Sequence, residues 1–266
     1  MPELPDVEVF KRYLDSTSLH QDIQKVEVAN TRILKNISAR QLQTRLKGRR
    51  FDSTSRHGKY LFVHLDDGQY LTLHFGMTGF PRYFKNDEKE PDHERVKVKF
   101  KNGYQLAYDN QRLLGTVKVI RDRNRFIDTN RLGPDALSPE FDFDAFQECL
   151  EDRRGMIKSA LMNQEIIAGI GNVYSDEILF QAGIHPKTSV GSLDTSALLS
   201  LYHAMKQVLQ RSIKADADPE KMPAAFLIPQ RHKGGICPNC DTPVEKIKVA
   251  GRSGYFCPAC QQRPED

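Results

Sequence analysis

Residues 164–186 read Q-E-I-I-A-G-I-G-N-V-Y-S-D-E-I-L-F-Q-A-G-I-H-P, and this stretch decides how the second half of the chain folds. Gly169 and Gly171 interrupt what would otherwise be one continuous helix, and Asn172 precedes the apolar positions that restart it. A helix that starts at Asn172 offers backbone N–H groups at its positive end, and these attract a phosphate. An ordinary turn between two helices, capped by Asn172, explains the same residues.

Upstream of this stretch the apolar residues change from helical spacing to alternation. Val7, Phe10 and Leu14 predict a leading helix close to the start of the chain. Period-two segments then predict β-strands at residues 59–65, 69–75, 95–100 and 116–120. We expect this region to form a β-sandwich or a flattened barrel.

A break in the pattern near residues 132–135 marks a domain boundary. Ser138 and Pro139 offer a helix cap followed by a proline at the first helical position. Helical spacing follows and is clearest at residues 198–209. The chain is therefore expected to be an α+β protein of several domains: an N-terminal β-sandwich with a leading helix at residues 1–130, a helical domain at 131–222, and a cysteine-bearing tail at 223–266.

Four of the five cysteines form two C-x2-C pairs in this tail, namely Cys237 with Cys240 and Cys257 with Cys260. The 16 residues between the pairs match a four-thiolate zinc ribbon, in which a hairpin joins two metal-binding turns. Four protein ligands leave no open position on the ion, so we predict one structural Zn²⁺. Arg252 lies between the pairs, where the hairpin would present it to a phosphate or simply to solvent.

Composition restricts the function only weakly. The 39 basic residues outnumber the 35 acidic ones by four, a mild excess that favours an acidic partner but is common among soluble enzymes. No run of apolar residues is long enough to span a membrane, and the first ten residues lack the features of a secretory signal. We expect a cytoplasmic protein that does not bind membranes.

Five separated segments together resemble the formamidopyrimidine-DNA glycosylase and endonuclease VIII family, and are closer to the formamidopyrimidine branch. They are the start M-P-E-L-P, the turn Gly76-Met77-Thr78-Gly79, the segment R-L-G-P-D-A-L at 131–137, the 164–186 stretch, and the cysteine tail. The resemblance implies a β-sandwich catalytic domain, a helix-two-turn-helix DNA-binding domain and a β-hairpin zinc finger. It also implies a base-excision repair enzyme that is both a DNA glycosylase and an AP lyase.

The resemblance assigns the catalytic roles to Pro2, Glu3 and Lys59. Removal of Met1 would leave Pro2 with a free secondary amine, and an α-amino group is partly neutral at pH 7. This amine would attack C1′ of the damaged nucleotide and form a Schiff base. Elimination at the β and δ positions would then nick the strand. Glu3 matches the family's general acid, and Lys59 matches a lysine that contacts the phosphate beside the lesion.

The resemblance also implies a set of residues that contact double-stranded damaged DNA. Met77 and Arg112 match side chains that fill the gap left when a base is turned out of the helix. Lys158, Asn172 and Arg252 match contacts to backbone phosphates, which carry no sequence information. His74 and His93 complete the predicted DNA-binding set. A monomer of bacterial or archaeal type, associated with the nucleoid, is expected.

Three departures from the family pattern surround the lesion rather than the nucleophile. Leu114 stands where the family's segment D-P-R-R-F-G has phenylalanine, since residues 110–115 read N-Q-R-L-L-G. Asp6 replaces a glutamate. The segment between Ile213 and Arg231 is shorter than in purine-specific members, whose loop here closes over 8-oxoguanine. Formamidopyrimidines, oxidised pyrimidines or hydantoins are therefore expected to be better substrates than 8-oxoguanine.

Two other functions remain open at this point. A DNA-binding module could retain this scaffold without its chemistry and act as a lesion sensor, although the presence of Pro2, Glu3 and Lys59 argues against it. An unrelated zinc-ribbon enzyme could begin with M-P-E-L-P by coincidence.

Overall fold

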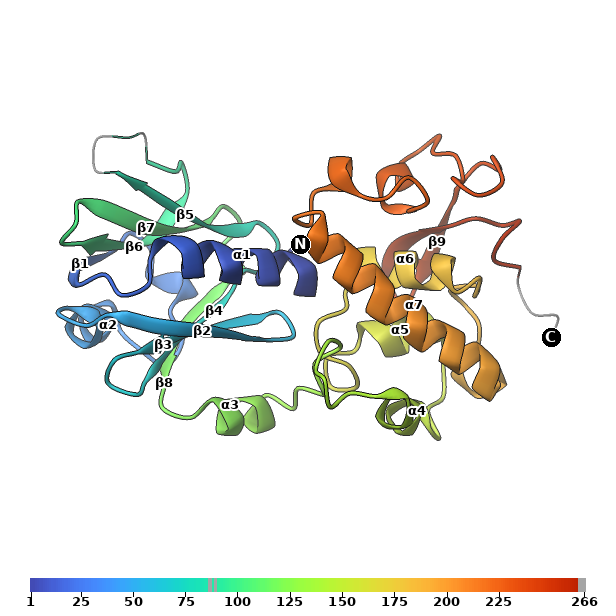
Figure 1. Cartoon of the computed structure of the whole chain (residues 1–266), viewed down its shortest axis with the longest axis horizontal. Helices are drawn as coiled ribbons and strands as arrows, with labels where there is room; N and C mark the ends of the chain where they lie inside the picture. The colour runs from blue at the N-terminus through green and yellow to red at the C-terminus, as the bar shows by residue number, and fades with distance from the viewer. Residues whose placement is uncertain (86–87, 89, 263–266) are drawn as a thin grey trace. The chain divides into compact units, whose positions relative to one another are not determined.

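The computed structural model describes residues 1–85, 88 and 90–262, which form two compact units (Figure 1). Unit 1 contains residues 1–2 and 6–130. Unit 2 contains residues 3–5 together with the chain from residue 131 onward. The three residues Glu3, Leu4 and Pro5 thus belong to a unit whose other residues are far away in the sequence.

Unit 1 is a sandwich of antiparallel sheets. In its described residues the strand orders are β1-β6-β7-β5 and β2-β3-β4-β8. Apolar side chains that alternate along the strands, such as Leu61, Val63, Leu71 and Leu73, fill its core. The strands are β1 (Ile23–Val28), β2 (Phe51–His57), β3 (Tyr60–Leu65), β4 (Tyr70–His74), β5 (Gly79–Lys85), β6 (Glu94–Phe100), β7 (Tyr104–Asn110) and β8 (Thr116–Ile120).

Three helices and one short 3-10 turn complete unit 1: α1 (Leu4–Thr17), η1 (Thr31–Ile33), α2 (Ala39–Leu46) and α3 (Arg123–Thr129). Val7 and Leu14 of α1 are fully buried in the core of unit 1, whereas Leu4 is fully buried in the core of unit 2. The two shorter helices begin at residues that cap them. Ser38 forms a capping box before α2, and the Asp122 carboxylate caps α3.

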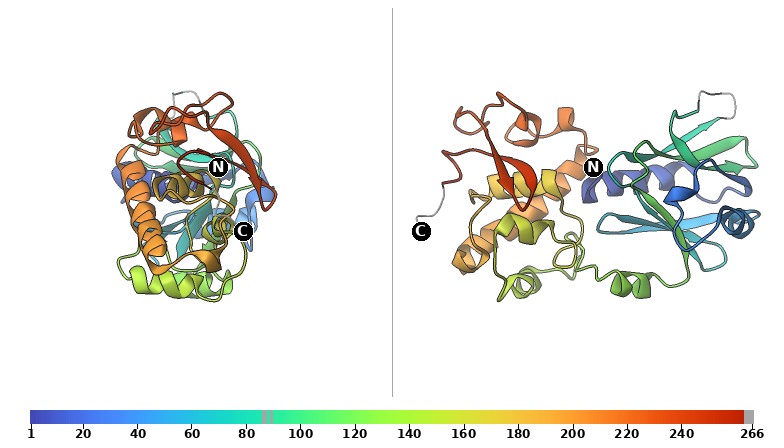
Figure 2. Two further views of the ribbon diagram at one scale, coloured as in Figure 1. Left: turned by 90° about the vertical axis from the view of Figure 1, so that its right-hand side faces the viewer. Right: turned by 180° about the vertical axis from the view of Figure 1, so that it is seen from behind.

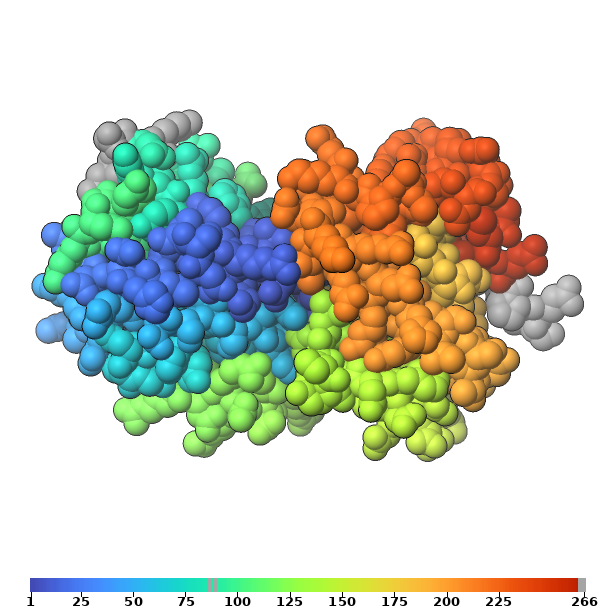
Figure 3. Space-filling model, viewed as in Figure 1, coloured from blue at the N-terminus to red at the C-terminus, as the bar shows by residue number. Residues whose placement is uncertain are grey.

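Unit 2 is built around helix α6 (Asn172–Gln181), whose residues from Tyr174 to Phe180 are all buried. The long helix α7 (Thr195–Lys214) is amphipathic and crosses the face of unit 2 drawn in orange in Figure 3. A hairpin of β9 and β10 lies against α6 (Figure 2), where the Tyr255 N–H donates to Asp176. The remaining bounds are α4 (Phe143–Leu150), α5 (Ile157–Met162), η2 (Val190–Ser192), η3 (Pro219–Lys221), η4 (Ile228–Gln230), β9 (Glu245–Val249) and β10 (Arg252–Phe256).

The predicted fold class is confirmed, and so is a helix that begins at Asn172. The strands predicted from alternation correspond to β3, β4, β6 and β8. Strands β1, β2, β5 and β7 were not predicted. Strands β1, β2 and β5 lie at sheet edges, where charges and a proline such as Pro81 are tolerated and weaken the apolar signal. Strand β7 lies inside its sheet, and residues 105–110 are all buried, so no alternation marks it. None of the described helices has both the length and the apolar character needed to cross a membrane.

Candidate functional site

The side chain of Glu3 is held at the start of helix α6 in unit 2. Its Oε2 atom accepts hydrogen bonds from the backbone N–H groups of Gly171 at 2.6 Å and Tyr174 at 3.3 Å, and its Oε1 atom accepts one from Val173 at 2.9 Å. Only 1% of Glu3 is exposed. Because a helix N-terminus carries a partial positive charge and free donors, it fixes this carboxylate in one position.

The two glycines ahead of α6 make room for the beginning of the chain. A Cβ atom at Gly171 would overlap the Glu3 carboxylate, and a Cβ atom at Gly169 would overlap the side chain of Leu4. The Leu4 N–H also donates to the Gly169 carbonyl at 3.0 Å. Three of the N–H groups expected to attract a phosphate at the start of α6 therefore bind a carboxylate of the same chain instead.

This arrangement predicts that Gly171→Ala destabilises unit 2. The backbone of Gly171 is extended, so the penalty comes from the new methyl group, which must displace a buried carboxylate from its donors. We expect a loss of about 1–3 kcal/mol of unfolding free energy in a urea titration followed by circular dichroism. Gly191→Ala is the matched control, because a Cβ atom there meets nothing within 4 Å. Equal stability of the two variants would contradict the contact.

A second buried cluster in unit 2 is centred on Asp176. Its Oδ1 atom pairs with the Lys158 ammonium, and its Oδ2 atom accepts from Arg231 Nη2 at 2.6 Å and from the Tyr255 N–H at 3.0 Å. Lys158 and Asp176 are both fully buried. Lys158, predicted to contact a phosphate, therefore has its charge compensated inside the protein in this structure.

The hairpin between the two cysteine pairs packs onto this cluster and onto Asn172. Asn172 Nδ2 donates to the Ser253 carbonyl at 2.7 Å. Gly254 is required here, because a Cβ atom would overlap the Lys158 ammonium. Arg252 lies at the start of β10 and is exposed, with Nη1 at 3.7 Å from the sulfur of Met162. The packing thus presents Arg252 at the surface of unit 2.

The four cysteine sulfurs of the tail lie within 4.8 Å of one another. Cys237 and Cys260 are 3.8 Å apart, and Cys240 lies 3.5 Å from both Cys257 and Cys260. Two thiolates bound at the Zn–S distance to a tetrahedral ion are about 3.8 Å apart. The residues therefore fit one Zn²⁺ with protein ligands in all four positions, as the spacing predicted. Such an ion holds the hairpin together and leaves no site for a reactive water.

Loss of the metal is expected to weaken DNA binding without unfolding unit 1. Cys237→Ser removes one ligand, so the hairpin that carries Arg252 should lose its order. We expect the affinity for duplex DNA, measured by fluorescence anisotropy, to fall about tenfold to a hundredfold, which is the value of one or two charge-assisted hydrogen bonds. Cys149→Ser is the control, because Cys149 lies outside the cluster. An unaltered affinity after complete zinc loss, measured by metal analysis, would count against this role.

In unit 1, Lys59 and His74 lie near each other on the sheet that contains β3 and β4. Lys59 is largely buried at the head of β3, and the His74 ring contacts Tyr60. Burial, together with the positive charges of Lys59 and Lys118, lowers the pKa of His74 to about 4. His74 is therefore neutral at pH 7. Its Nδ1 atom accepts from the Gly76 N–H at 3.3 Å, which leaves the Nε2 proton for an external acceptor.

Two neighbouring loops of unit 1 expose apolar side chains. Met77 follows β4 and is 40% exposed, and Leu114 follows β7 and is 52% exposed. The loops are joined where the Arg112 N–H donates to the Thr78 hydroxyl at 3.2 Å. Large apolar side chains at such exposure favour a role outside the folding of the monomer.

His93 is the last of the predicted DNA-binding residues. It lies just before β6, and its backbone is hydrogen-bonded to residues of β7. Its N–H donates to the Asp109 carboxylate at 2.9 Å, and its carbonyl accepts from the Asn110 N–H at 3.0 Å. The side chain lines a small pocket of about 280 Å³ together with Arg82, Asp92 and Gln111. Unit 1 therefore contains Lys59, His74, Met77, His93 and Arg112, and unit 2 contains Glu3, Lys158, Asn172 and Arg252.

The sequence matches three domain families that occur together. Residues 1–117 match the formamidopyrimidine-DNA glycosylase N-terminal domain, residues 132–223 match the formamidopyrimidine-DNA glycosylase H2TH domain, and residues 236–263 match the zinc finger found in FPG and IleRS. The chain belongs to the formamidopyrimidine-DNA glycosylase family. The resemblance inferred from the five separated segments is thereby confirmed.

Relatives within the formamidopyrimidine-DNA glycosylase family match over nearly their whole length. The enzyme of Syntrophomonas wolfei is 34% identical over 278 residues, covering 98% of this chain and 100% of that protein. The enzyme of Bacillus licheniformis is 32% identical and covers 99% of this chain and 100% of that protein. The structure of Lactococcus lactis Fpg in complex with DNA containing an abasic site has a TM-score of 0.89 at 32% identity, covering 98% of this chain and 100% of that chain.

Family membership does not reveal every residue that shapes the site. The Asp176–Arg231 pair and the buried Glu177 were not predicted as an ionic cluster, although charged residues inside an apolar helix such as α6 are a usable signal. Glu177 accepts from the Ile228 N–H at 2.7 Å, and burial raises its pKa to about 7. Tyr174 of the same helix is also buried.

Proposed function

We propose that this member of the formamidopyrimidine-DNA glycosylase family removes oxidised or ring-opened bases from double-stranded DNA and nicks the strand as an AP lyase. The observation that carries the proposal is the buried carboxylate of Glu3, held by three backbone N–H groups at the start of α6. Glu3 follows the proposed nucleophile directly in the sequence, so this contact fixes an acid–base group next to the Pro2 amine.

In the proposed reaction, the nucleophile is the secondary amine of Pro2 after Met1 has been removed. Its nitrogen forms a bond to C1′ while the bond from C1′ to the damaged base breaks, and the departing base takes a proton from solvent. The Glu3 carboxylate accepts the proton that the Pro2 nitrogen loses and donates it to the sugar O4′, so the C1′–O4′ bond opens and an iminium ion is left. Loss of a C2′ proton then expels the 3′-phosphate, and a second elimination expels the 5′-phosphate. Water finally releases the amine.

The other residues are proposed to hold the DNA for this reaction. Lys59 and the Nε2–H group of His74 would contact phosphates beside the lesion, and His93 would contact the same DNA. Met77 and Arg112 would fill the gap left by the extruded base. Leu114 stands beside them as a second exposed apolar side chain, and we propose that it replaces the missing phenylalanine as a wedge.

Contacts from unit 2 are proposed at Asn172 and Arg252. Lys158 is assigned a different part from the one expected, because its ammonium is buried against Asp176. We propose that Lys158 supports the Arg252 hairpin, which packs onto its ammonium at Gly254, without bonding a phosphate in the conformation described. A monomer acting on double-stranded damaged DNA follows from this scheme.

The test of the proposed function is trapping of the Schiff base. The full chain is incubated with a duplex that contains an abasic site, and borohydride is added to reduce the iminium ion. A covalent adduct is expected, and mass spectrometry of a digest should locate the added mass on the peptide that contains Pro2. The Lys59→Gln variant lacks the side-chain amine at position 59 and should still form the adduct, because the proposed nucleophile is the amine of Pro2. No adduct with any abasic or damaged duplex would leave a lesion-binding module as the better description.

We propose that 8-oxoguanine is a poorer substrate than formamidopyrimidines, oxidised pyrimidines or hydantoins. In the described structure the segment between α7 and the zinc finger forms the short turns η3 and η4, and Met222, Phe226 and Leu227 anchor it in the core. This leaves little chain to close over a large purine lesion. Single-turnover excision from matched duplexes should therefore be faster for formamidopyrimidine, oxidised pyrimidine or hydantoin lesions than for 8-oxoguanine. A dominant activity on 8-oxoguanine would show that the short segment does not limit the substrate.

A further inference from the structure

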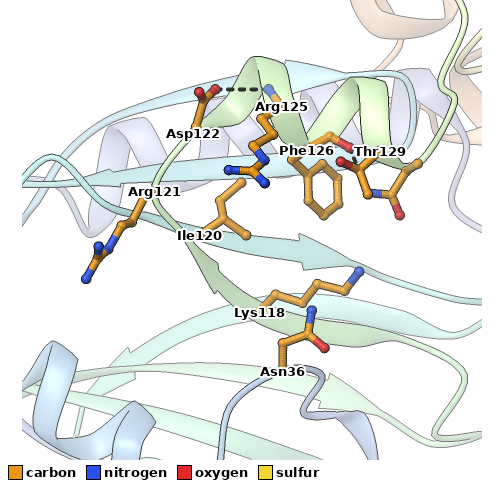
Figure 4. Close-up of a pocket in the computed structure, with 9 residues that line it drawn as sticks. Asn36, Lys118, Ile120, Arg121, Asp122, Arg125, Phe126 and Thr129 are labelled. Carbon is orange, nitrogen blue, oxygen red and sulfur yellow. Dashed lines mark hydrogen bonds between the residues drawn. The ribbon is translucent and has the colours of Figure 1, made fainter.

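Unit 1 contains a pocket of about 360 Å³ to which none of the roles above is assigned. It opens between strand β8 and helix α3, and Figure 4 shows the side chains that line it. Arg125 and Phe126 reach from α3 toward the strand, and Lys118 and Asn36 face them from the other side, whereas Arg121 is directed away from this group. Three separate segments of the chain thus bring donors to one place.

The described lining of the pocket carries three basic side chains and one carboxylate, that of Asp122. Among the described residues, no carboxylate oxygen lies within 4 Å of a side-chain nitrogen of Lys118, Arg121 or Arg125. Asp122 lines the same pocket, but its carboxylate caps α3 by accepting the Arg125 N–H at 2.9 Å. Burial, together with the charge of Lys35, lowers the pKa of Lys118. The Lys118 ammonium is therefore partly buried near the positive charge of Lys35, which lies outside the pocket lining, and an anion would offset this repulsion.

The floor of the pocket is apolar and rigid. Phe126 is buried and makes edge contacts with Tyr60 and Phe62, and the Lys118 ammonium lies 4.9 Å from its ring centre. Asn36 adopts a left-handed backbone with φ of 62°, which is tolerated by asparagine. The apolar floor is thus fixed by packing, and the exposed Arg125 and Asn36 side chains extend over it from two other segments of the chain.

We propose that this pocket binds a phosphate group through Arg125, Lys118 and Asn36. The planar guanidinium of Arg125 can donate two hydrogen bonds to one phosphate, and Lys118 supplies a second charge. The phosphate comes either from the backbone of the bound DNA or from free phosphate in solution. The DNA source rests on the proposed function.

The position of the pocket within unit 1 favours the DNA backbone as the source. Lys118 pairs with Thr72 across the β4–β8 ladder, two residues from His74 on the same strand. His74 and Lys118 therefore lie on one face of the sheet, and the charges of Lys118 and Lys59 both lower the pKa of His74. A DNA strand whose phosphates contact Lys59 and His74 would therefore have further phosphates near Lys118 and Arg125.

Arg125→Gln in the full chain tests the proposal, with Arg40→Gln as the matched control. Arg40 is an exposed arginine near the start of α2 and does not line the pocket. The affinity for a duplex with an abasic-site analogue is measured by fluorescence anisotropy over a range of salt concentrations. If a DNA phosphate occupies the pocket, the slope of log affinity against log salt should fall in magnitude by about 0.9 in Arg125→Gln. Arg125→Lys should retain most of the slope, since it keeps the charge.

The second arm titrates inorganic phosphate into the protein without DNA and follows phosphorus-31 line width. An unchanged salt slope, with broadening by the wild type and Arg40→Gln but not by Arg125→Gln, would assign the pocket to free phosphate. Identical behaviour of Arg125→Gln and Arg40→Gln in both arms would overturn the proposal. Borohydride trapping at Pro2 is a separate measurement. If the wild-type protein forms no adduct, the proposed function is contradicted. The titration with inorganic phosphate still tests the pocket in that case.

Discussion

When Pro2 is replaced in Pro2→Gly and the resulting terminal amine is acetylated, we expect the borohydride-trapped adduct with abasic DNA to disappear. An amide nitrogen has no available lone pair and cannot attack C1′, so covalent chemistry should stop. Removing the nucleophile from an enzyme that uses covalent catalysis costs about four orders of magnitude or more in rate. Adduct formation under single-turnover conditions, resolved by denaturing electrophoresis, measures this loss.

The matched control is Pro2→Gly with its amine left free. A primary amine can still form a Schiff base, so this variant should retain adduct formation at a reduced rate. Because the two samples differ only by the acetyl group, the comparison separates the chemistry of the amine from the packing of the chain start. Equal trapping in both would place the nucleophile on another residue, and Lys59 would be the first candidate.

Glu3→Gln is expected to lower base excision by about a hundredfold to ten-thousandfold, the range typical of a general acid. The substitution should affect two activities differently. Excision of an intact damaged nucleotide needs a proton on O4′ to open the sugar ring, whereas an abasic site already exists partly as the open aldehyde. Trapping on abasic DNA should therefore survive in Glu3→Gln, while release of a damaged base should nearly cease.

Glu3→Gln is also expected to lower the stability of the protein. Both carboxylate oxygens of Glu3 accept from backbone N–H groups, and a glutamine keeps only one oxygen. One donor at the start of α6 will lose its acceptor, at a cost of about 1–3 kcal/mol in unfolding free energy. A urea titration of the variant corrects for this. If excision and trapping fall by the same factor, Glu3 acts by positioning the chain start and not as an acid.

Local sequence determined much of the fold and the whole of the metal site. Alternation predicted the inner strands β3, β4 and β6 and the edge strand β8, because a half-buried strand repeats every two residues. The two C-x2-C pairs predicted four clustered sulfurs, since each pair needs only one turn and a hairpin to meet the other. Strands β1, β2, β5 and β7 were not predicted. The first three lie at sheet edges, where charged and polar residues interrupt the apolar pattern, and β7 is buried over six consecutive residues, so it shows no alternation.

The surroundings of the proposed site were decided only by the tertiary structure. The glycines at 169 and 171 indicated a break between two helices, and the N–H groups at the start of the second helix were predicted to be available to a phosphate. In the folded chain Glu3 fills that position from 168 residues away, and Asp176 likewise takes up the charges of Lys158 and Arg231. A hydrogen bond depends on which groups the packed chain brings within about 3 Å of each other, and no local pattern encodes that distance. The sequence by itself thus determined the elements, the zinc ligands and the family, and tertiary packing decided which charged groups are compensated inside the protein and which, such as Arg252, are left at its surface.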